Sequence, residues 1–419
     1  MKRIITSVGL VAVSATGMQA AYAPGLGQIE SSKLLTYSVA VRGFYDDNIA
    51  TTPSSSPIAI QNSFGFDVRP SVSLNWTTLQ QTYIGATYTY GMRYFFDREP
   101  HRADHTHEFS ARLEHAFDQR FKLNVDDSFV YAQEPEVLGD LGVLQRTDFS
   151  AYRNTAGFDF SGQITELFGL GIGYSNSWYD YVQKGVGLRA SLLNRFEHSV
   201  KLDSRWVLNP KLTAKVGYRL SISDYTSGEE ILAGSGLTGK ARNNLAHTVY
   251  GGMDYTVNTR LKGSLEAGVR LTSYDNPVAG SDQTSPYVSA NATYVYRENS
   301  YLQLGVTVDR TATDLIGTNA ANITSDAQSI SPYVSISHKI TPRLTGSLLG
   351  RFNHYTYNGG SANKLSEDFL SLQLNLDYKI SEHWSTTLTY NYDKLSSVAG
   401  LGGRSFDRDR VFLGFTATY

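Results

Sequence analysis

The sequence predicts an all-β fold, a transmembrane antiparallel up-and-down β-barrel of about 18 strands, or about 16 if one predicted pair is merged. Three observations predict it. The N-terminus has the pattern of an export signal, apolar and polar residues alternate along nearly the whole remaining chain, and the chain ends on an alternating segment with a terminal aromatic residue. Short turns are expected on the periplasmic side and long loops outside.

Residues 1–23 are predicted to be a secretory signal peptide. Lys2 and Arg3 supply the positive charge, the stretch from Ile4 to Ala15 is apolar and small, and Ala21-Tyr22-Ala23 resembles a cleavage site. A buried first helix of a soluble domain is the alternative, but it gives the small-residue tail no role.

The cleavage position itself has alternatives. Cleavage after Ala23 would leave Pro24 at the new N-terminus, which peptidases disfavour, so cleavage after Ala20 or Ala21 is also open. No cysteine follows the signal, which excludes a lipoprotein anchor.

Composition suits a membrane barrel and excludes other classes of protein. The chain has 28 Tyr and 19 Phe against 4 Trp, which fits many strands and an aromatic girdle at each membrane interface. Its net charge of -2 and its interleaved charges exclude a basic face for nucleic acid. No segment after the signal offers about 18 consecutive apolar residues, which excludes a helical span.

Strand periodicity runs through residues 35–419, which we predict to form the barrel after a short periplasmic segment at 24–34. The alternations reach the roughly nine to eleven residues that a tilted transmembrane strand needs, and exceed ordinary soluble strands of about five or six. A soluble β-sandwich or propeller would have shorter strands or a blade repeat. The clearest alternation places these residues at every second position: Leu370, Leu372, Leu374, Leu376, Tyr378 and Ile380.

Connections alternate between two kinds, as expected for an outer-membrane barrel whose strands run from about 35–46 to 408–419. Tight turns are predicted at residues 118–120, 209–211, 258–260, 297–300, 341–343 and 381–383. Long loops are predicted at 47–61, 133–149, 226–243, 313–326 and 395–406. The pattern gives about eight turns and nine loops and leaves both termini in the periplasm.

The last strand carries the sharpest signal. Val411, Leu413, Phe415, Ala417 and Tyr419 alternate with Phe412, Gly414, Thr416 and Thr418, and the chain stops on an aromatic. This segment resembles the terminal signal by which the barrel-assembly machinery recognises its clients, with Val411, Leu413, Phe415 and Tyr419 as the assembly-signal residues. Together with a signal peptide, it indicates an outer-membrane protein of a Gram-negative bacterium.

Two motifs in the first third of the chain point to a family. Phe44-Tyr45-Asp46-Asp47-Asn48-Ile49 follows the opening strand, and Arg69-Pro70-Ser71-Val72-Ser73-Leu74 precedes the first short turn. The chain resembles the putative β-barrel porin 2 group of outer-membrane proteins. The resemblance implies a porin-like barrel of undefined substrate, with some relatives associated with exopolysaccharide export, and it carries over no binding residues.

If the apolar set faces lipid, the other set lines the interior and carries charges of both signs. The basic pore-lining candidates are Arg42, Arg69, Arg112, Arg153, Lys201, Arg205, Lys215, Arg219, Arg270 and Arg351. The acidic candidates are Asp67, Glu108, Glu114, Asp126, Asp159, Glu197, Asp203, Glu266, Asp309 and Asp377. Such charges would order water and polar solutes in a channel. The alternative is a salt-bridge network that braces or closes the wall.

Other candidate sites have simpler explanations. A divalent metal could be held by His101, Asp104, His105 and His107, and calcium could be held by oxygens of Asp46, Asp47 and Asn48. Polar loop tips and strand ends commonly have this composition, so we predict no metal site and no cofactor. Tyr88, Tyr90, Tyr94, Phe95, Tyr179 and Tyr181 could stack on sugar rings, although an aromatic girdle accounts for most such residues.

No enzyme is predicted. The nine His are scattered, and no Gly-x-Ser-x-Gly motif is present. We expect a channel for passive diffusion of small polar solutes, with an exopolysaccharide exporter and a structural or adhesive barrel as the alternatives. The expected partners are outer-membrane lipid and lipopolysaccharide, the barrel-assembly machinery, periplasmic chaperones, and small polar solutes or polysaccharide. The sequence leaves monomer and trimer open.

Overall fold

The computed structural model describes residues 33–419 apart from 79–80, 100, 134–149, 280–281 and 317–322. These residues form one antiparallel sheet of 18 strands, as predicted. In chain order the strands are β1 Leu35–Asp46, β2 Ser63–Thr78, β3 Thr82–Phe95, β4 Ala103–Ala116, β5 Phe121–Ala132, β6 Ala151–Gln163, β7 Phe168–Tyr181, β8 Arg195–Asn209, β9 Leu212–Tyr225, β10 Asn244–Thr256, β11 Leu261–Tyr274, β12 Gln283–Arg297, β13 Ser300–Thr311, β14 Thr324–Lys339, β15 Leu344–Gly359, β16 Ser366–Lys379, β17 Trp384–Ser397 and β18 Phe406–Thr418. The short helices are α1 Arg189–Leu193, η2 Gly239–Arg242, η3 Pro277–Ala279, η4 Gly360–Ala362 and η5 Ala399–Leu401.

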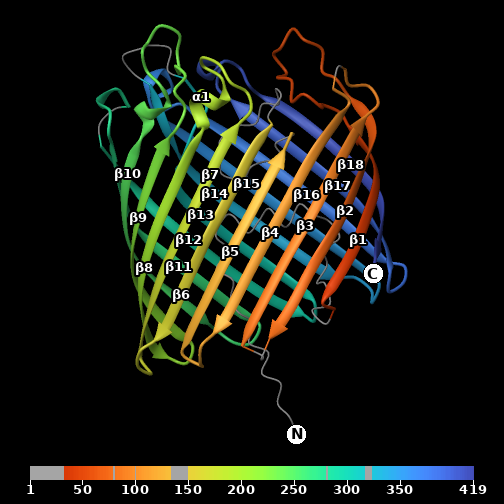
Figure 1. Cartoon of the computed structure of the whole chain (residues 1–419), viewed down its shortest axis with the longest axis vertical. Coiled ribbons are helices and arrows are strands. Elements are labelled where there is room, and N and C mark those ends of the chain that lie inside the picture. Colours follow the sequence, from red (N-terminus) through yellow and green to blue (C-terminus); the bar gives the residue numbers. More distant parts are fainter. Residues whose placement is uncertain (1–32, 79–80, 100, 134–149, 280–281, 317–322) are drawn as a thin grey trace.

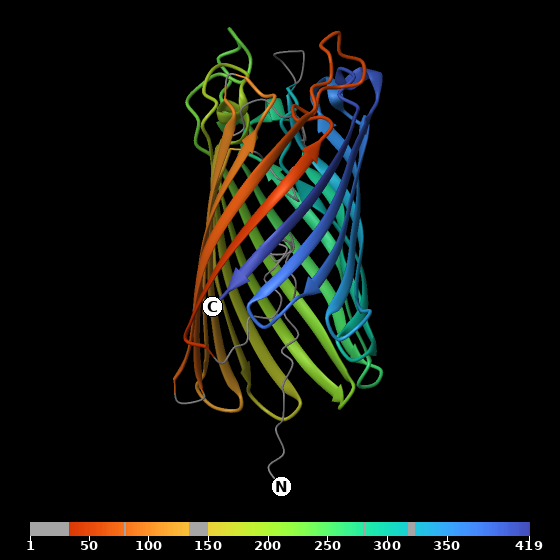
Figure 2. The same cartoon turned by 90° about the vertical axis from the view of Figure 1, so that its right-hand side faces the viewer.

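The sheet closes on itself. Every strand pairs with its neighbours in the chain, and β1 also pairs with β18, from Ser38 opposite Thr418 to Asp46 opposite Arg410. Figure 2 faces this seam, where the red β1 lies beside the violet β18. A closed sheet leaves no row of unpaired backbone groups, which is the condition for crossing a bilayer with strands.

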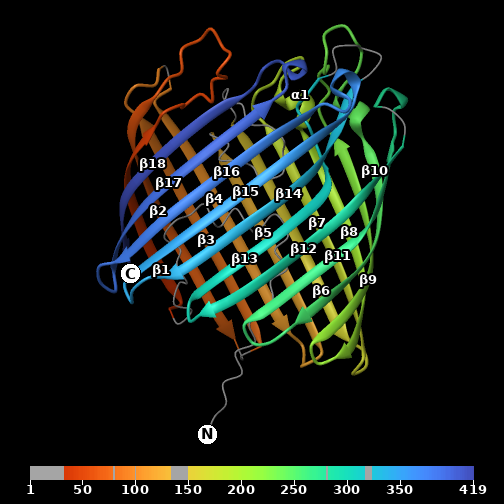
Figure 3. The same cartoon turned by 180° about the vertical axis from the view of Figure 1, so that it is seen from behind.

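The strands are long and strongly tilted, as Figures 1 and 3 show. They contain 12 to 16 residues each, for example 12 in β1 and 16 in β15, which exceeds the roughly nine to eleven that a tilted strand needs to cross the hydrocarbon layer. None of the helices among the described residues is long and apolar enough to span a membrane.

Five of the short connections share one local hydrogen-bonding arrangement. A side-chain oxygen at the start of the turn accepts hydrogen bonds from the backbone N–H groups two and three residues later. Asp118 does so from Arg120 and Phe121, Asn258 from Arg260 and Leu261, and the same arrangement starts from Thr165, Thr341 and Ser381. These two bonds hold the pKa of the Asp118 carboxyl below its usual value.

The predicted alternation corresponds to the two faces of the wall. In β16 the side chain of Leu374 is 45% exposed on the outside, whereas its neighbour Gln373 is 2% exposed on the inside. Polar side chains are therefore collected in the interior and apolar ones on the outer surface, which is the reverse of a soluble protein.

Some predicted boundaries are wrong by a few residues. The predicted loop 313–326 ends earlier, because β14 begins at Thr324 with a β-bulge between Thr324 and Asp326. The predicted loop 395–406 is shorter, because β17 continues to Ser397 and β18 starts at Phe406. Polar residues at strand ends resemble loop residues in composition, so the predicted strand ends differ from the observed ones by a few residues.

Inward-facing glycines let long side chains lie flat against the wall. A Cβ added at Gly414 would lie 2.3 Å from Cγ of Arg42, and one at Gly217 would lie 2.3 Å from the ring of Tyr250. The stem of Arg42 lies over Gly414 of β18 while its guanidinium bonds to Asp67 of β2, and Tyr250 crosses Gly217 to donate a hydrogen bond to Asp203. These glycines keep large polar groups along the wall instead of across the lumen.

The loops at one end of the barrel interlock, and we call this group of loops the cap. Arg242 of η2 is fully buried and donates to the carbonyl oxygens of Leu192 (3.1 Å), Thr313 (2.7 Å) and Leu315 (2.6 Å). One guanidinium thus joins the β7–β8, β9–β10 and β13–β14 loops. Desolvation lowers the pKa of Arg242, although Tyr225 and Asp326 act in the opposite direction.

A second ionic contact extends the cap to the other side of the barrel mouth. Asp314 of the β13–β14 loop pairs with Arg189 of α1 and, at 3.2 Å, with Nη1 of Arg404 in the β17–β18 loop. Arg404 also donates to the buried carboxylate of Glu367 at 3.1 Å. Since Asp314 bridges loops from distant strands, it holds the cap together across the mouth.

An apolar cluster supports the cap from below. It includes Leu192 and Leu193 of α1, Ile231, Ala241 and Ile323. The sequence did not predict α1, which has only five residues and none of the length or periodicity that identifies a helix.

We expect Gly414→Ala to destabilise the barrel by about 1–3 kcal/mol, the usual penalty for overpacking, because the added Cβ displaces Arg42 from Asp67. The matched control is Gly43→Ala, one residue along in the same strand pair on the outward face, where a Cβ meets nothing within 4 Å. Urea unfolding in liposomes would measure both variants, and equal unfolding midpoints would contradict this account of the glycines.

We expect Asp314→Asn to loosen the cap, because Arg189 and Arg404 would lose the carboxylate between them; breaking such a buried pair typically costs about 3–5 kcal/mol. Limited proteolysis of the protein in liposomes should then cleave the long loops faster than in the parent. Asp275→Asn, at an exposed acid in the β11–β12 loop, should leave the cleavage rate unchanged. Cleavage at the parent rate in Asp314→Asn would show that this residue does not hold the loops.

Candidate functional site

The charged residues predicted to line a pore all lie in strands, on the inward face. Their side chains alternate with exposed apolar ones, as Asp203 does with Leu202 and Glu266 with Leu265. Their part in solute passage stays a prediction. The structure divides them into a densely paired group, a looser group, and the lining of one cavity.

The densely paired group lies on β1 to β3 and β18. Nε of Arg42 donates to Oδ1 of Asp67 at 2.7 Å, and Nε of Arg69 lies 3.7 Å from the same carboxylate. The guanidinium of Arg42 also lies over the ring of Phe412, 4.9 Å from its centroid. These groups brace the wall at the closing seam. In this region the charges therefore form a salt-bridge network, which the sequence predicts as the alternative to a channel lining.

The sequence missed several members of this network. Arg93 lies 4.0 Å from Asp67, Arg408 pairs with Asp46 at 2.5 Å, and Arg410 pairs with Asp393 at 2.5 Å. A signal was present for the last two arginines, because residues 406, 408, 410 and 412 occupy the alternate positions to the apolar set of the final strand.

The looser group spans β4 to β6 and β8 to β11. Arg112 pairs with Glu114 at 2.5 Å while both remain exposed to the lumen, and Lys215 bridges Asp254 (2.9 Å) and Glu266 (3.0 Å). Of the other predicted residues, Asp126 is exposed on the strand next to Arg112, and the guanidinium of Arg153 lies over the ring of Tyr179. Asp159 lies by Gly173, and Lys201 and Arg205 flank Asp203. Outside this group, Asp377 of β16 accepts a hydrogen bond from Thr387.

The possible metal ligands are separated by the wall. Asp104 faces inward and is held by both terminal nitrogens of Arg98, whereas His105 and His107 face outward and bond to Tyr90 and Tyr88. Among the residues that the structure describes, no group of three or more such side chains could hold a metal ion. In the possible calcium site, the carboxylate of Asp46 already pairs with the guanidinium of Arg408.

The candidate sugar-stacking aromatics also divide between the two faces. Tyr88, Tyr90 and Tyr94 lie on the outer face in aromatic contacts with neighbours, as a girdle requires. Phe95 and Tyr181 are buried inside in packed clusters. Tyr179 alone of the predicted set borders the cavity described next.

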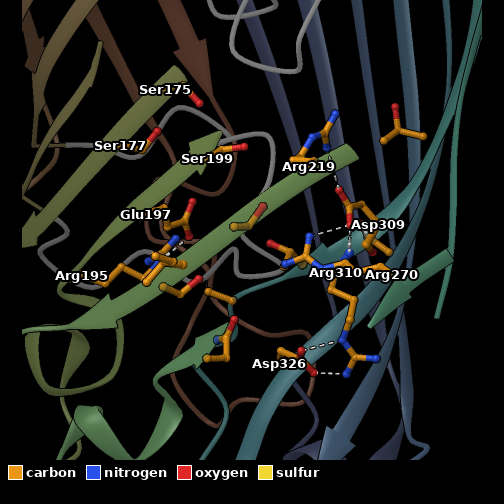
Figure 4. A pocket seen from close by; sticks show the side chains of 18 of the residues that line it. Ser175, Ser177, Arg195, Glu197, Ser199, Arg219, Arg270, Asp309, Arg310 and Asp326 are labelled. Atoms are coloured by element: carbon orange, nitrogen blue, oxygen red, sulfur yellow. Dashed lines mark hydrogen bonds and ion pairs between the residues drawn. The ribbon is translucent and has the colours of Figure 1, made fainter. Parts of the chain in front are cut away.

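A polar cavity of about 300 Å³ lies under the cap, between β7–β9 and β13–β15. Figure 4 shows Arg195 and Glu197 on one side of it, and Arg219, Arg270, Asp309, Arg310 and Asp326 on the other. Its lining joins residues more than 130 positions apart in the chain, such as Ser175 and Arg351, because the closed barrel brings β7–β9 opposite β13–β15. The predicted candidates Arg219, Arg270 and Arg351 meet here, with Glu197 and Asp309.

The register of the strands arranges one wall of the cavity in rows. The uppermost row is Tyr179, Arg195 and Tyr225, in which the guanidinium of Arg195 lies 4.0 Å from the Tyr179 ring centroid. The next rows down are Ser177, Glu197, Ser223 and Asn244, then Ser175, Ser199 and Ser221, then Arg219 and Arg270. The wall thus changes from aromatic at the cap to hydroxylic and then to basic.

The comparisons with known proteins give a family. The family model described as putative beta-barrel porin 2 matches residues 33–419. A search of the curated proteins finds no match.

Among solved structures, the chain is similar to the following three proteins. It is 11% identical to OccAB3 of Acinetobacter baumannii, over 92% of this chain and 99% of that one, with a TM-score of 0.41. It is 10% identical to a BenF-like porin of Pseudomonas fluorescens Pf-5, over 92% and 99%, with a TM-score of 0.45. It is 10% identical to the ferric enterobactin receptor PfeA of Pseudomonas aeruginosa, over 92% and 80%, with a TM-score of 0.42.

The family match covers the whole barrel, so it shows the family, which the fold alone cannot show. It confirms the resemblance seen in the two N-terminal motifs and the expectation of a channel instead of an enzyme. This chain belongs to the putative beta-barrel porin 2 family and is a porin-type channel of the outer membrane.

Proposed function

We propose that the protein lets small polar solutes diffuse passively through its lumen across the outer membrane of a Gram-negative bacterium, which it reaches through a cleaved signal peptide. The observation that carries the proposal is the interior: a closed wall of 18 strands whose inward polar side chains lie flat over glycines and leave a polar cavity. An aqueous, polar lumen lowers the barrier for hydrophilic solutes and offers nothing to apolar ones.

The cap supports selection by size. Arg242 and Asp314 tie loops from distant strands over the mouth, so a solute must pass between ordered loops before it meets the cavity. Loops tied to one another in this way favour the passage of small solutes over the export of a long polymer.

Single-channel recording of the refolded protein in a planar bilayer tests the proposal. We expect steady conductance that small neutral sugars reduce by entering the pore, and that neutral polymers too large to enter leave unchanged. Silence from a barrel shown to be folded by its heat-dependent gel mobility would contradict passive diffusion and favour an exporter or a loop-presenting scaffold.

We further propose that the end of β18 is read by the barrel-assembly machinery, with periplasmic chaperones carrying the unfolded chain. Val411, Leu413, Phe415 and Tyr419 all point outward and are 40% to 57% exposed, so their side chains are not needed by the interior. Tyr419 is tied to Tyr37 by two backbone hydrogen bonds of 2.8 and 2.9 Å, and its ring stacks on His383.

We expect Tyr419→Ala to slow assembly in cells while the refolded protein keeps its stability in urea, because the backbone bonds to Tyr37 remain. Tyr419→Phe, which keeps the terminal aromatic ring, should assemble at the parent rate. The fraction of heat-modifiable protein in outer-membrane fractions measures assembly. Normal assembly of Tyr419→Ala would remove this residue from the signal.

A further inference from the structure

We propose that the cavity under the cap is a binding site for small hydroxylated carboxylates, the class to which sugar acids belong. The inference rests on the proposed function, because it names the solutes that the channel would favour. It draws on three observations: the balance of charge in the cavity, a row of serine hydroxyls, and the position of Arg219 in the neighbouring row of the same wall.

The cavity carries more positive than negative charge. Five arginines, Arg195, Arg219, Arg270, Arg310 and Arg351, and three acids, Glu197, Asp309 and Asp326, line it, which leaves an excess of two positive charges. A surplus of arginine in a narrow, partly desolvated space attracts anions and repels cations.

Each acid is already engaged by an arginine. Glu197 accepts from Nε of Arg195 at 2.6 Å, Asp326 from Nε of Arg310 at 2.7 Å, and Asp309 from Nη1 of Arg270 at 2.8 Å. The carboxylates therefore stabilise neighbouring guanidinium groups and offer little to an incoming cation.

Arg219 is the arginine best placed to meet an anion. It shares Asp309 with Arg270 and lies 3.8 Å from it, so one carboxylate serves two guanidinium groups. Its side chain is 22% exposed, and its other close contact is a neutral hydroxyl, that of Tyr287 at 3.0 Å. A solute carboxylate would supply the missing negative charge and could bind in the paired geometry that guanidinium favours.

A band of hydroxyls lines the same cavity. Ser175, Ser199 and Ser221 stand side by side across β7, β8 and β9, and Ser221 is the next inward residue after Arg219 along β9. Within the described part of the chain these three hydroxyls have no hydrogen-bonded partner, so they can bond to solute hydroxyls.

The two features together define the ligand. The arginine recognises the carboxylate, and the serine row, which lies one inward position nearer the cap and crosses the wall from β9 to β7, recognises hydroxyls of the same solute. A neutral polyol would meet only the serines, and a simple carboxylate only the arginine. A sugar acid satisfies both, which gives it the advantage over either.

Equilibrium binding to the folded barrel in detergent tests the inference without requiring conduction. Calorimetry should show saturable binding of gluconate at millimolar affinity, with glucitol, the neutral polyol of the same carbon number, bound about tenfold more weakly. Arg219→Gln should weaken gluconate binding by about tenfold, the contribution of a charge-assisted hydrogen bond, and leave glucitol unaffected. Arg343→Gln, at an exposed arginine in the β14–β15 turn, should change neither.

Ion selectivity gives the second measurement. In a potassium chloride gradient the parent should prefer chloride over potassium, and both Arg219→Gln and Arg351→Gln should lower that preference. Equal affinities for gluconate and glucitol, unchanged gluconate binding in Arg219→Gln, or a cation-selective pore would each overturn the inference. A folded barrel that binds gluconate through Arg219 but does not conduct would refute passive diffusion and keep the binding site.

Discussion

The backbone hydrogen bond is the constraint on which this structure depends. Inside a bilayer a strand has no water to satisfy its N–H and C=O groups, so every strand needs two partners and the first strand must meet the last. The pairing of β1 with β18 provides this closure. Once the wall is closed, the two-residue repeat of a strand sends alternate side chains to lipid and to the lumen, and the distribution of polar residues follows.

Closure creates a second problem, which is where to put charged side chains in a confined interior. On β1 to β3 each charge has a close partner, as Arg42 has in Asp67. Glycines such as Gly414 give these long side chains room to lie along the wall. The cavity under the cap is different, because its arginines outnumber its acids, so the electrostatic character of the lumen differs from one side of the wall to the other.

The sequence predicted the features that depend on short-range patterns. The outward Leu374 and inward Gln373 follow from period-two alternation, and turns such as Asp118–Arg120 follow from residues whose side chains accept backbone hydrogen bonds. Closure into about 18 strands follows from their number and length. Residues 1–32 and residues 134–149 of the predicted loop 133–149 lie outside the described residues, so the signal peptide stays a prediction.

The parts that the sequence could not give depend on contacts between distant segments. Nothing near Arg242 in the chain indicates that its guanidinium will be buried against Thr313 and Leu315, 71 and 73 residues away. Similarly, the sequence predicts that Arg219 points inward, but the ion pairs of both Arg219 and Arg270 with Asp309 depend on the register across five strands. Pairing inside a barrel is decided by neighbours on other strands, which periodicity along one strand does not reveal.

The seam has a consequence for the order of folding. Asp46 and Arg408 pair across β1 and β18 and are separated by 362 residues. All the other pairings in the described sheet join strands that are consecutive in the chain. Each hairpin can form from strands adjacent in the chain, but the seam needs the first and last strands to meet. Until they do, the sheet is open and has two unpaired edges, and the ionic contacts at the seam act only when the cylinder closes.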